Sequence, residues 1–177
     1  MGTLVLIAVL GIAWVVYAFN KALDPVESVD QYEEMLSEWR PSGLVGHFPS
    51  SVPGAATNVV FSSFPGFLQG GAHIQLRMVL PEAEVHRLYE HATKTANQHQ
   101  DGGNSVTLVN QRDDGLWSTN PHTLGDEVFV FPVDYRIFIF DAVPAPGAAG
   151  HGWNHGESKG MVVSLQRNEV LYFAENW

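Results

Sequence analysis

His73-Ile-Gln-Leu-Arg-Met78 decides the fold, because polar and apolar side chains alternate along it residue by residue. Successive side chains of a β-strand point to opposite faces of the sheet, so a period of two predicts a strand with one buried face. Pro81 follows at the first position of an amphipathic helix predicted over residues 81–99. This pair of elements predicts a sheet with a helix packed on one face.

Further strand patterns lie on both sides of this stretch. Tyr135–Val143 is a nearly continuous apolar run, which is typical of a central strand buried on both faces. The other predicted strands are Val59–Ser62, Ser105–Val109, Val128–Phe131 and a hairpin of Met161–Leu165 with Val170–Ala174. Because strands and helices do not alternate along the chain, the sequence predicts an α+β fold with a mainly antiparallel sheet and one or two packed helices.

The N-terminal segment predicts a membrane anchor. From Thr3 to Phe19 the seventeen residues TLVLIAVLGIAWVVYAF carry no charge, and as a helix they rise about 25 Å, close to the thickness of a bilayer core. A cleaved signal peptide would need a basic start and a small-x-small cleavage site, and both are missing. A buried core helix would be shorter and would have a polar face. We therefore expect a single transmembrane helix that contacts lipid through residues 3–19.

The chain then divides into a transmembrane anchor over residues 1–21, an acidic helix and linker over 22–45, and a globular domain over 46–177. Ser28 and Gln31 match a capping box at the start of the acidic helix, which is predicted within 24–40. We predict a single-pass membrane protein with its domain outside the cytoplasm. Lys21, next to the span, favours the opposite orientation by the positive-inside rule, so a cytoplasmic domain stays open.

Composition excludes several classes of function. The 177 residues carry a formal net charge of −10, and their few basic residues form no cluster, so nucleic acid is not an expected partner. Cysteine is absent, which excludes disulfide scaffolds, thiolate metal sites and cysteine nucleophiles. No nucleotide-binding motif occurs and no cofactor is predicted. Gly156-Glu-Ser-Lys-Gly160 fits the G-x-S-x-G pattern in letters, but a loop precedes it and a strand follows, so no catalytic residue is assigned there.

One loop is the candidate metal site. His151, His155 and Glu157 all lie in one glycine-rich segment of seven residues. Two imidazoles with a carboxylate suit a divalent ion when the loop curls. The alternative is that these histidines bond loop carbonyl groups or contact another subunit.

His73, Gln75 and Arg77 form a second candidate site, because they point the same way from one predicted strand. A guanidinium group binds carboxylates and phosphates in bidentate fashion, so this face predicts a small anionic ligand on Arg77. The alternative is a solvated face of the sheet.

Aromatic residues outside the predicted core are candidate contact points for a partner. Tryptophan and tyrosine are favoured at interfaces, where an apolar ring and a polar atom are both useful. The predicted interaction residues are Trp14, Tyr17, Trp39, Trp153 and Trp177.

Several strings resemble an uncharacterised family of small bacterial proteins that are membrane-anchored or exported. They are His47-Phe-Pro49, Pro65-Gly-Phe-Leu-Gln-Gly-Gly71, Ile74-Gln-Leu-Arg77, Asn154-His-Gly-Glu-Ser158 and Tyr172-Phe-Ala-Glu-Asn-Trp177. The resemblance covers roughly residues 45–177. It implies a bacterial protein with one domain behind an anchor, and it implies no activity and no site residues.

These observations predict a membrane-anchored accessory subunit or interaction module, without catalytic activity, of a larger integral membrane complex such as a respiratory or photosynthetic assembly. One alternative is a membrane-anchored hydrolase or metal-dependent enzyme that uses residues 151–157. The other is a sensor or binding domain for a small ligand on the Arg77 face.

Overall fold

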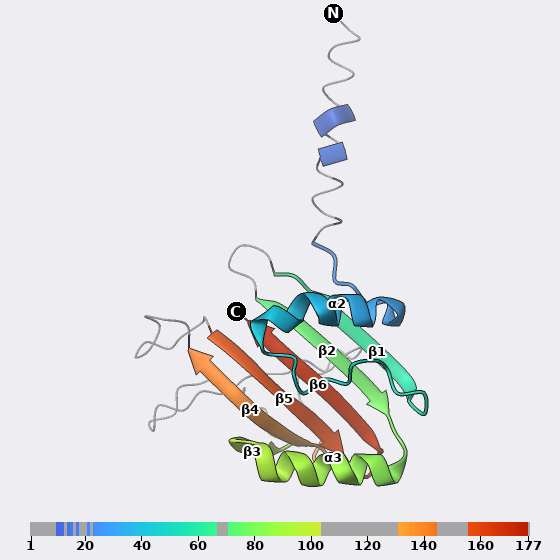
Figure 1. Cartoon of the computed structure of the whole chain (residues 1–177), viewed down its shortest axis with the longest axis vertical. Coiled ribbons are helices and arrows are strands. Elements are labelled where there is room, and N and C mark those ends of the chain that lie inside the picture. The colour runs from blue at the N-terminus through green and yellow to red at the C-terminus, as the bar shows by residue number, and fades with distance from the viewer. Residues whose placement is uncertain are drawn as a thin grey trace, which may run out of the picture.

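The computed structural model describes residues 10–12, 14–15, 17, 21, 23–66, 71–103, 131–144 and 156–176. Within these ranges the chain forms a six-stranded antiparallel sheet in the order β1-β2-β6-β5-β4-β3 (Figure 1). The strands are β1 (Thr57–Phe64), β2 (Ala72–Val79), β3 (Gln98–Asp101), β4 (Arg136–Pro144), β5 (Gly156–Ser164) and β6 (Glu169–Asn176). The helical segments are η1 (Val29–Gln31), α2 (Tyr32–Trp39), η2 (Arg40–Ser42) and α3 (Glu82–Thr95).

The predicted fold class and membrane location are corrected by this structure. The described chain is an antiparallel sheet with few helices, and no helix in it is long and apolar enough to cross a membrane. A crossing needs about 20 continuous apolar residues, whereas before Ala22 only 10–12, 14–15, 17 and 21 are described. The other positions of the predicted span lie outside the described residues. The transmembrane helix over 1–21 and the single-pass membrane localisation are therefore wrong as predictions.

The last strand joins the two halves of the sheet. Strand β6 lies between β2 and β5 and pairs with both along its full length. It forms the predicted hairpin with β5, in which Ser164 lies opposite Glu169. The C-terminal residues therefore occupy the centre of the sheet, where both faces of a strand are available for packing (Figure 1).

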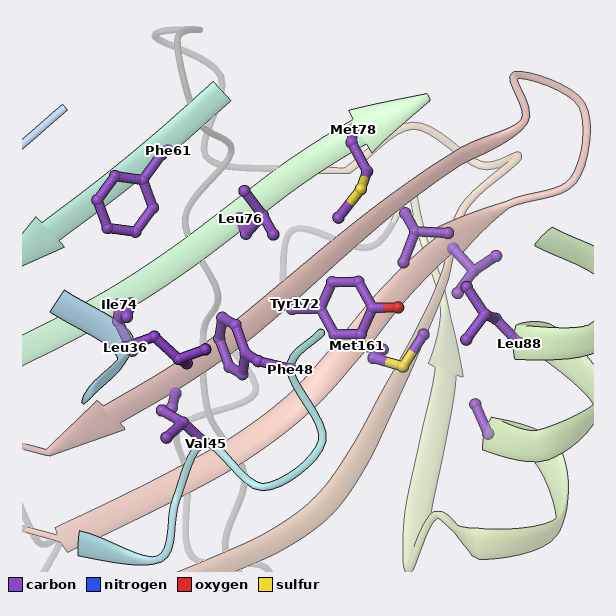
Figure 2. Close-up of a cluster of buried hydrophobic side chains, with 14 of the residues drawn as sticks. Leu36, Val45, Phe48, Phe61, Ile74, Leu76, Met78, Leu88, Met161 and Tyr172 are labelled. Carbon is purple, nitrogen blue, oxygen red and sulfur yellow. The ribbon is translucent and has the colours of Figure 1, made fainter. Parts of the chain in front are cut away.

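The first face of the sheet carries the main hydrophobic core. Ile74, Leu76 and Met78 of β2 are completely buried on it, which confirms the predicted alternation. Helices α2 and α3 both pack on this face. Loop residues Val45 and Phe48 belong to the same core, and the Phe48 ring lies beside Tyr172 (Figure 2). The first face is thus covered by α2 and the loop after it, which precede the β1–β2 hairpin in the chain, and by α3, which follows the hairpin.

The two helices differ in extent from their predictions. Helix α3 ends at Thr95, and Gln98–Asp101 forms the edge strand β3 against β4 instead of a last helical turn. Helix α2 begins at Tyr32 after the short η1 turn, and the Ser28 side chain makes no capping hydrogen bond. The predicted capping box is therefore wrong. The predicted strand 105–109 and residues 128–130 of the predicted strand 128–131 lie outside the described residues.

The second face carries a smaller apolar cluster. Its buried members are Phe131, Tyr135, Ile137, Val162, Leu171 and Phe173, with Val60 packed against them. Because Val162, Leu171 and Phe173 alternate with first-face residues along β5 and β6, both faces of the central strands are buried. The apolar cluster covers only part of the second face.

Candidate functional site

A group of polar side chains lies beside this apolar cluster on the second face. His73 of β2 lies directly opposite Glu175 of β6, and Glu175 lies directly opposite Ser158 of β5. Ser62 of β1 lies opposite Gln75 of β2 in the next row of cross-strand pairs. We call these five residues the polar row. Directly opposed residues of an antiparallel pair have Cβ atoms about 5 Å apart, so the polar row is one continuous group.

Four of the five residues of the polar row are almost closed to solvent, and His73 is half-buried. Exposed fractions are 0% for Gln75, 1% for Ser158 and 7% for both Ser62 and Glu175. Burying a hydroxyl or a carboxylate costs free energy unless a hydrogen bond or a charge compensates it. Among the described residues, the Ser158 hydroxyl is buried and has no hydrogen-bond partner. A buried polar group without a partner is rare in native structures, and an ordered water or a bound ligand is a contact that can satisfy it.

One hydrogen bond within the polar row joins a hydroxyl to an imidazole. The Ser62 Oγ lies 3.2 Å from the His73 Nε2, and the tautomer of the ring decides which of the two donates. The ring of Phe64 packs beside the imidazole, with ring centroids 5.9 Å apart. These two contacts restrain the His73 ring, with its Nε2 directed at Ser62.

Arg77 lies at one end of this face. On β2 it follows Gln75 by two residues, opposite Val60 on β1 and Leu171 on β6. His73, Gln75 and Arg77 share a face, as predicted. The alternative of a solvated face does not hold at Gln75, which is completely buried, whereas His73 and Arg77 are half-buried. All three residues already take part in interactions within the chain.

The predicted metal loop is not brought together in the described part of the chain. His151 and His155 lie outside the described residues. Glu157 lies in β5 with its side chain exposed, where its carboxylate accepts a 3.4 Å hydrogen bond from the Asn176 amide. Within the ranges that the structure covers, no three histidine or acidic side chains form a group that could hold a metal ion.

The predicted interaction residues fall into three classes. Trp14 and Tyr17 are 69% and 64% exposed. Trp39 instead packs against the first-face core, where α2 holds it. Trp153 and Trp177 lie outside the described residues. Only Trp14 and Tyr17 are therefore available as contact points in the described structure.

On the first face, His47 is a half-buried histidine that packs among aromatic rings. Its Nε2 lies 2.9 Å from the carbonyl oxygen of Gly160, and its ring packs edge-on against Phe48 and Phe140 with centroids 4.8 and 5.2 Å away. Burial lowers the pKa of His47 to about 4, and nearby Lys159 acts in the same direction, against the hydrogen bond to Gly160. His47 is therefore neutral at pH 7 and links a loop to the centre of the sheet.

Sequence reasoning missed three members of the polar row: Ser62, Ser158 and Glu175. A signal existed for Glu175, because it continues the alternation of Leu171 and Phe173 by two residues and so had to share their buried face. A charged residue in phase with buried apolar ones is informative. For Ser62 and Ser158 no such signal existed, because serine is common on either face of a strand.

No protein-family model, curated protein or solved structure matches this chain. The resemblance to small bacterial exported proteins therefore stays a prediction. The geometry of the polar row and of Arg77 alone carries the functional argument.

Proposed function

We propose that this protein is a binding domain for a small polar ligand with an anionic group, held on the second face of the sheet by the polar row and Arg77. The observation that carries the proposal is the buried Ser158 hydroxyl without a partner, next to Glu175 in the polar row, which spans four strands. Ligand sites are mostly apolar with a few converging polar groups, and here the apolar cluster of Phe173 and Leu171 borders the polar row.

The chemistry of these side chains defines the ligand class. Serine hydroxyls and the Gln75 amide both donate and accept hydrogen bonds, and Glu175 accepts them. Arg77 supplies a planar fork of N–H donors that matches a carboxylate or a phosphate. Because Arg77 and Gln75 already interact within the chain, the ligand takes the place of some of these contacts when it binds. A small molecule with hydroxyl or carbonyl groups and one anionic group fits this set.

Replacing Arg77 by alanine should abolish binding of small anions. We expect benzoate or inorganic phosphate to raise the melting temperature of the full chain. Binding adds RT ln(1 + [L]/Kd) to the free energy of unfolding. The increase should saturate with ligand concentration and should be lost in Arg77→Ala. The measurement is thermal unfolding followed by circular dichroism over a series of ligand concentrations.

The matched control is Arg87→Ala, which removes an exposed arginine of α3 that pairs with Glu84. This variant should keep the full ligand response. If Arg77→Ala keeps the same ligand response as Arg87→Ala, the anions act on the protein surface in general. The proposal would then be wrong.

The described N-terminal residues favour a second candidate function, an interaction module of a larger protein assembly. Leu10, Ile12, Trp14, Val15 and Tyr17 are helical, and each exposes more than half of its side chain. Contiguous exposed apolar residues mark contact sites. A partner protein that covers these side chains would remove them from water.

A photo-reactive amino acid at position 14 should crosslink one defined partner in cells that express the chain. Crosslinking reports direct contact, so the same amino acid at Glu33, an exposed position of α2, should not give this product. Mass spectrometry of the crosslinked band is the measurement. If both positions give the same set of proteins, the contact is nonspecific and this candidate function fails.

A further inference from the structure

We propose that Ser62, His73 and Glu175 form a nucleophile, a general base and a positioning carboxylate for the hydrolysis of small esters. This inference rests on the proposed function, because it assigns a reaction to the same face that is proposed to bind the ligand. The three residues lie on three adjacent strands, β1, β2 and β6, in that order across the sheet.

The first contact of this arrangement is the 3.2 Å approach of the Ser62 Oγ to the His73 Nε2. A serine hydroxyl is a weak nucleophile and needs a base within hydrogen-bond reach. Histidine is the side chain best suited to take that proton near neutral pH. Ser62 and His73 therefore satisfy the distance condition for an activated nucleophile.

The second requirement is a group that orients the base. With Nε2 committed to Ser62, the Nδ1 atom lies on the other edge of the imidazole ring. Glu175 is the direct cross-strand neighbour of His73 on the opposite side from β1. A carboxylate in that position holds the imidazole in one tautomer and stabilises the imidazolium form that appears during reaction. Phe64 packs against the same ring and restricts it further.

The surroundings restrict the substrate. Ser62 is only 7% exposed, so the acyl group that reaches it must be small. Ser62 lies opposite Gln75, and Arg77 is the next residue of β2 on this face, which places the two Cβ atoms about 7–8 Å apart as a diagonal pair. An anionic group bound to Arg77 is then within reach of an ester at Ser62. The substrate class is a short ester that carries a carboxylate or phosphate.

The reaction proceeds in two balanced steps. The Ser62 Oγ attacks the ester carbonyl carbon and its proton passes to the His73 Nε2; the bond to the alcohol oxygen then breaks, and the alcohol leaves with that proton. Water next attacks the acyl group on Ser62 and gives one proton to His73. The carboxylic acid leaves, and Ser62 recovers its proton from His73.

A fluorophosphonate probe tests this assignment. We expect the full chain to gain the mass of one adduct on the peptide that contains Ser62. We also expect it to release p-nitrophenol from the mono-p-nitrophenyl ester of succinate, a short ester that carries a carboxylate. Ser62→Ala should lose both signals. His73→Ala should slow adduct formation by about 100-fold or more, since general base catalysis contributes about 10²–10⁴-fold.

The matched control is Ser63→Ala. Ser63 is also buried, at 3% exposure, but it lies on the first face, where its backbone N–H and carbonyl groups bond Val26, so this variant should label at the rate of the unmodified chain. Glu175→Gln should label about tenfold more slowly or worse, and Glu175→Asp should recover part of the rate, which a purely structural role would not produce.

The outcomes separate this inference from the proposed function. A chain that keeps its Arg77-dependent response to benzoate but forms no adduct binds a ligand without catalysis, and this inference is then wrong. An adduct on Ser158 or any other serine would also overturn it. Melting temperatures of the Ser62→Ala and Ser63→Ala variants show whether either result comes from unfolding.

Discussion

Replacing Gly160 by alanine should lower the free energy of unfolding by about 3 kcal/mol, the upper end of the cost of overpacking a core. A Cβ at this position would fall onto the carbonyl oxygen of Phe138 in the neighbouring strand β4 and would lie 2.6 Å from the ring of Phe173. The carbonyl oxygen belongs to the backbone, so it cannot rotate away as a side chain can. Strands β4 and β5 must therefore separate locally, or the Phe173 ring must leave the second-face cluster.

The measurement is urea unfolding, in which the transition midpoint should fall while its slope stays the same. For a chain of this size the loss corresponds to a melting temperature lower by roughly 10 °C. Gly54→Ala is the control, because a Cβ at Gly54 would meet nothing within 4 Å. This control should change stability by less than about 0.5 kcal/mol. Equal stability of the two variants would contradict the packing described for Gly160.

The elements that the sequence predicted best are those in which apolar residues recur regularly, at every second position of a strand or along one face of a helix over several turns. The alternation of Ile74, Leu76 and Met78 predicted β2 and its buried face, and both are present. The stripe that includes Val85 and Leu88 predicted α3 in the same way. In each case the local pattern and the tertiary burial agree, so the pattern was enough.

The elements that sequence missed depend on contacts with distant residues. Gln98–Asp101 carries no apolar alternation, and it forms β3 because β4 offers its edge, with Asp101 opposite Arg136. The loop around His47 has a composition rich in proline, glycine and serine, yet Val45 and Phe48 are core residues. No local signal separates such a buried loop from an exposed one.

The candidate site was predicted only in part for the same reason. His73 and Arg77 were identified because they share one strand, where spacing alone decides which face they occupy. Ser62 and Glu175 join them from two other strands, and only the register of the sheet brings them next to His73. Register is set by packing across the whole sheet, so a single sequence does not reveal this group.

Acidification should destabilise this protein through His47. The pKa of this imidazole is about 4 in the folded chain because it is buried, whereas a histidine in an unfolded chain titrates near 6.5. Between these values the unfolded state binds more protons than the folded state, so the free energy of unfolding falls as the pH falls. Above about pH 6.5, His47 is neutral in both states and does not reduce the free energy of unfolding. Between that pH and pH 4, its titration lowers the free energy of unfolding by about 3 kcal/mol.

Urea unfolding at a series of pH values from 7 to 4 measures this loss in the unmodified chain and in His47→Gln. Carboxylates that titrate in this range contribute equally to both proteins, so the difference between their pH dependences isolates His47. We expect His47→Gln to be less stable at pH 7, because the Gly160 carbonyl loses its imidazole partner, but to lose about 2–3 kcal/mol less than the unmodified chain on acidification.

His91→Gln is the matched control, because His91 is exposed on α3, and its pH dependence should equal that of the unmodified chain. Since His47 connects the loop around Val45 and Phe48 to Gly160 at the centre of the sheet, its protonation should release the loop first. Protection of the Phe48 amide, which bonds the Val45 carbonyl oxygen, should then fall at a higher pH than protection of the amides in β6. If loop and strand lose protection together, His47 reports only global unfolding and does not hold the loop on the sheet.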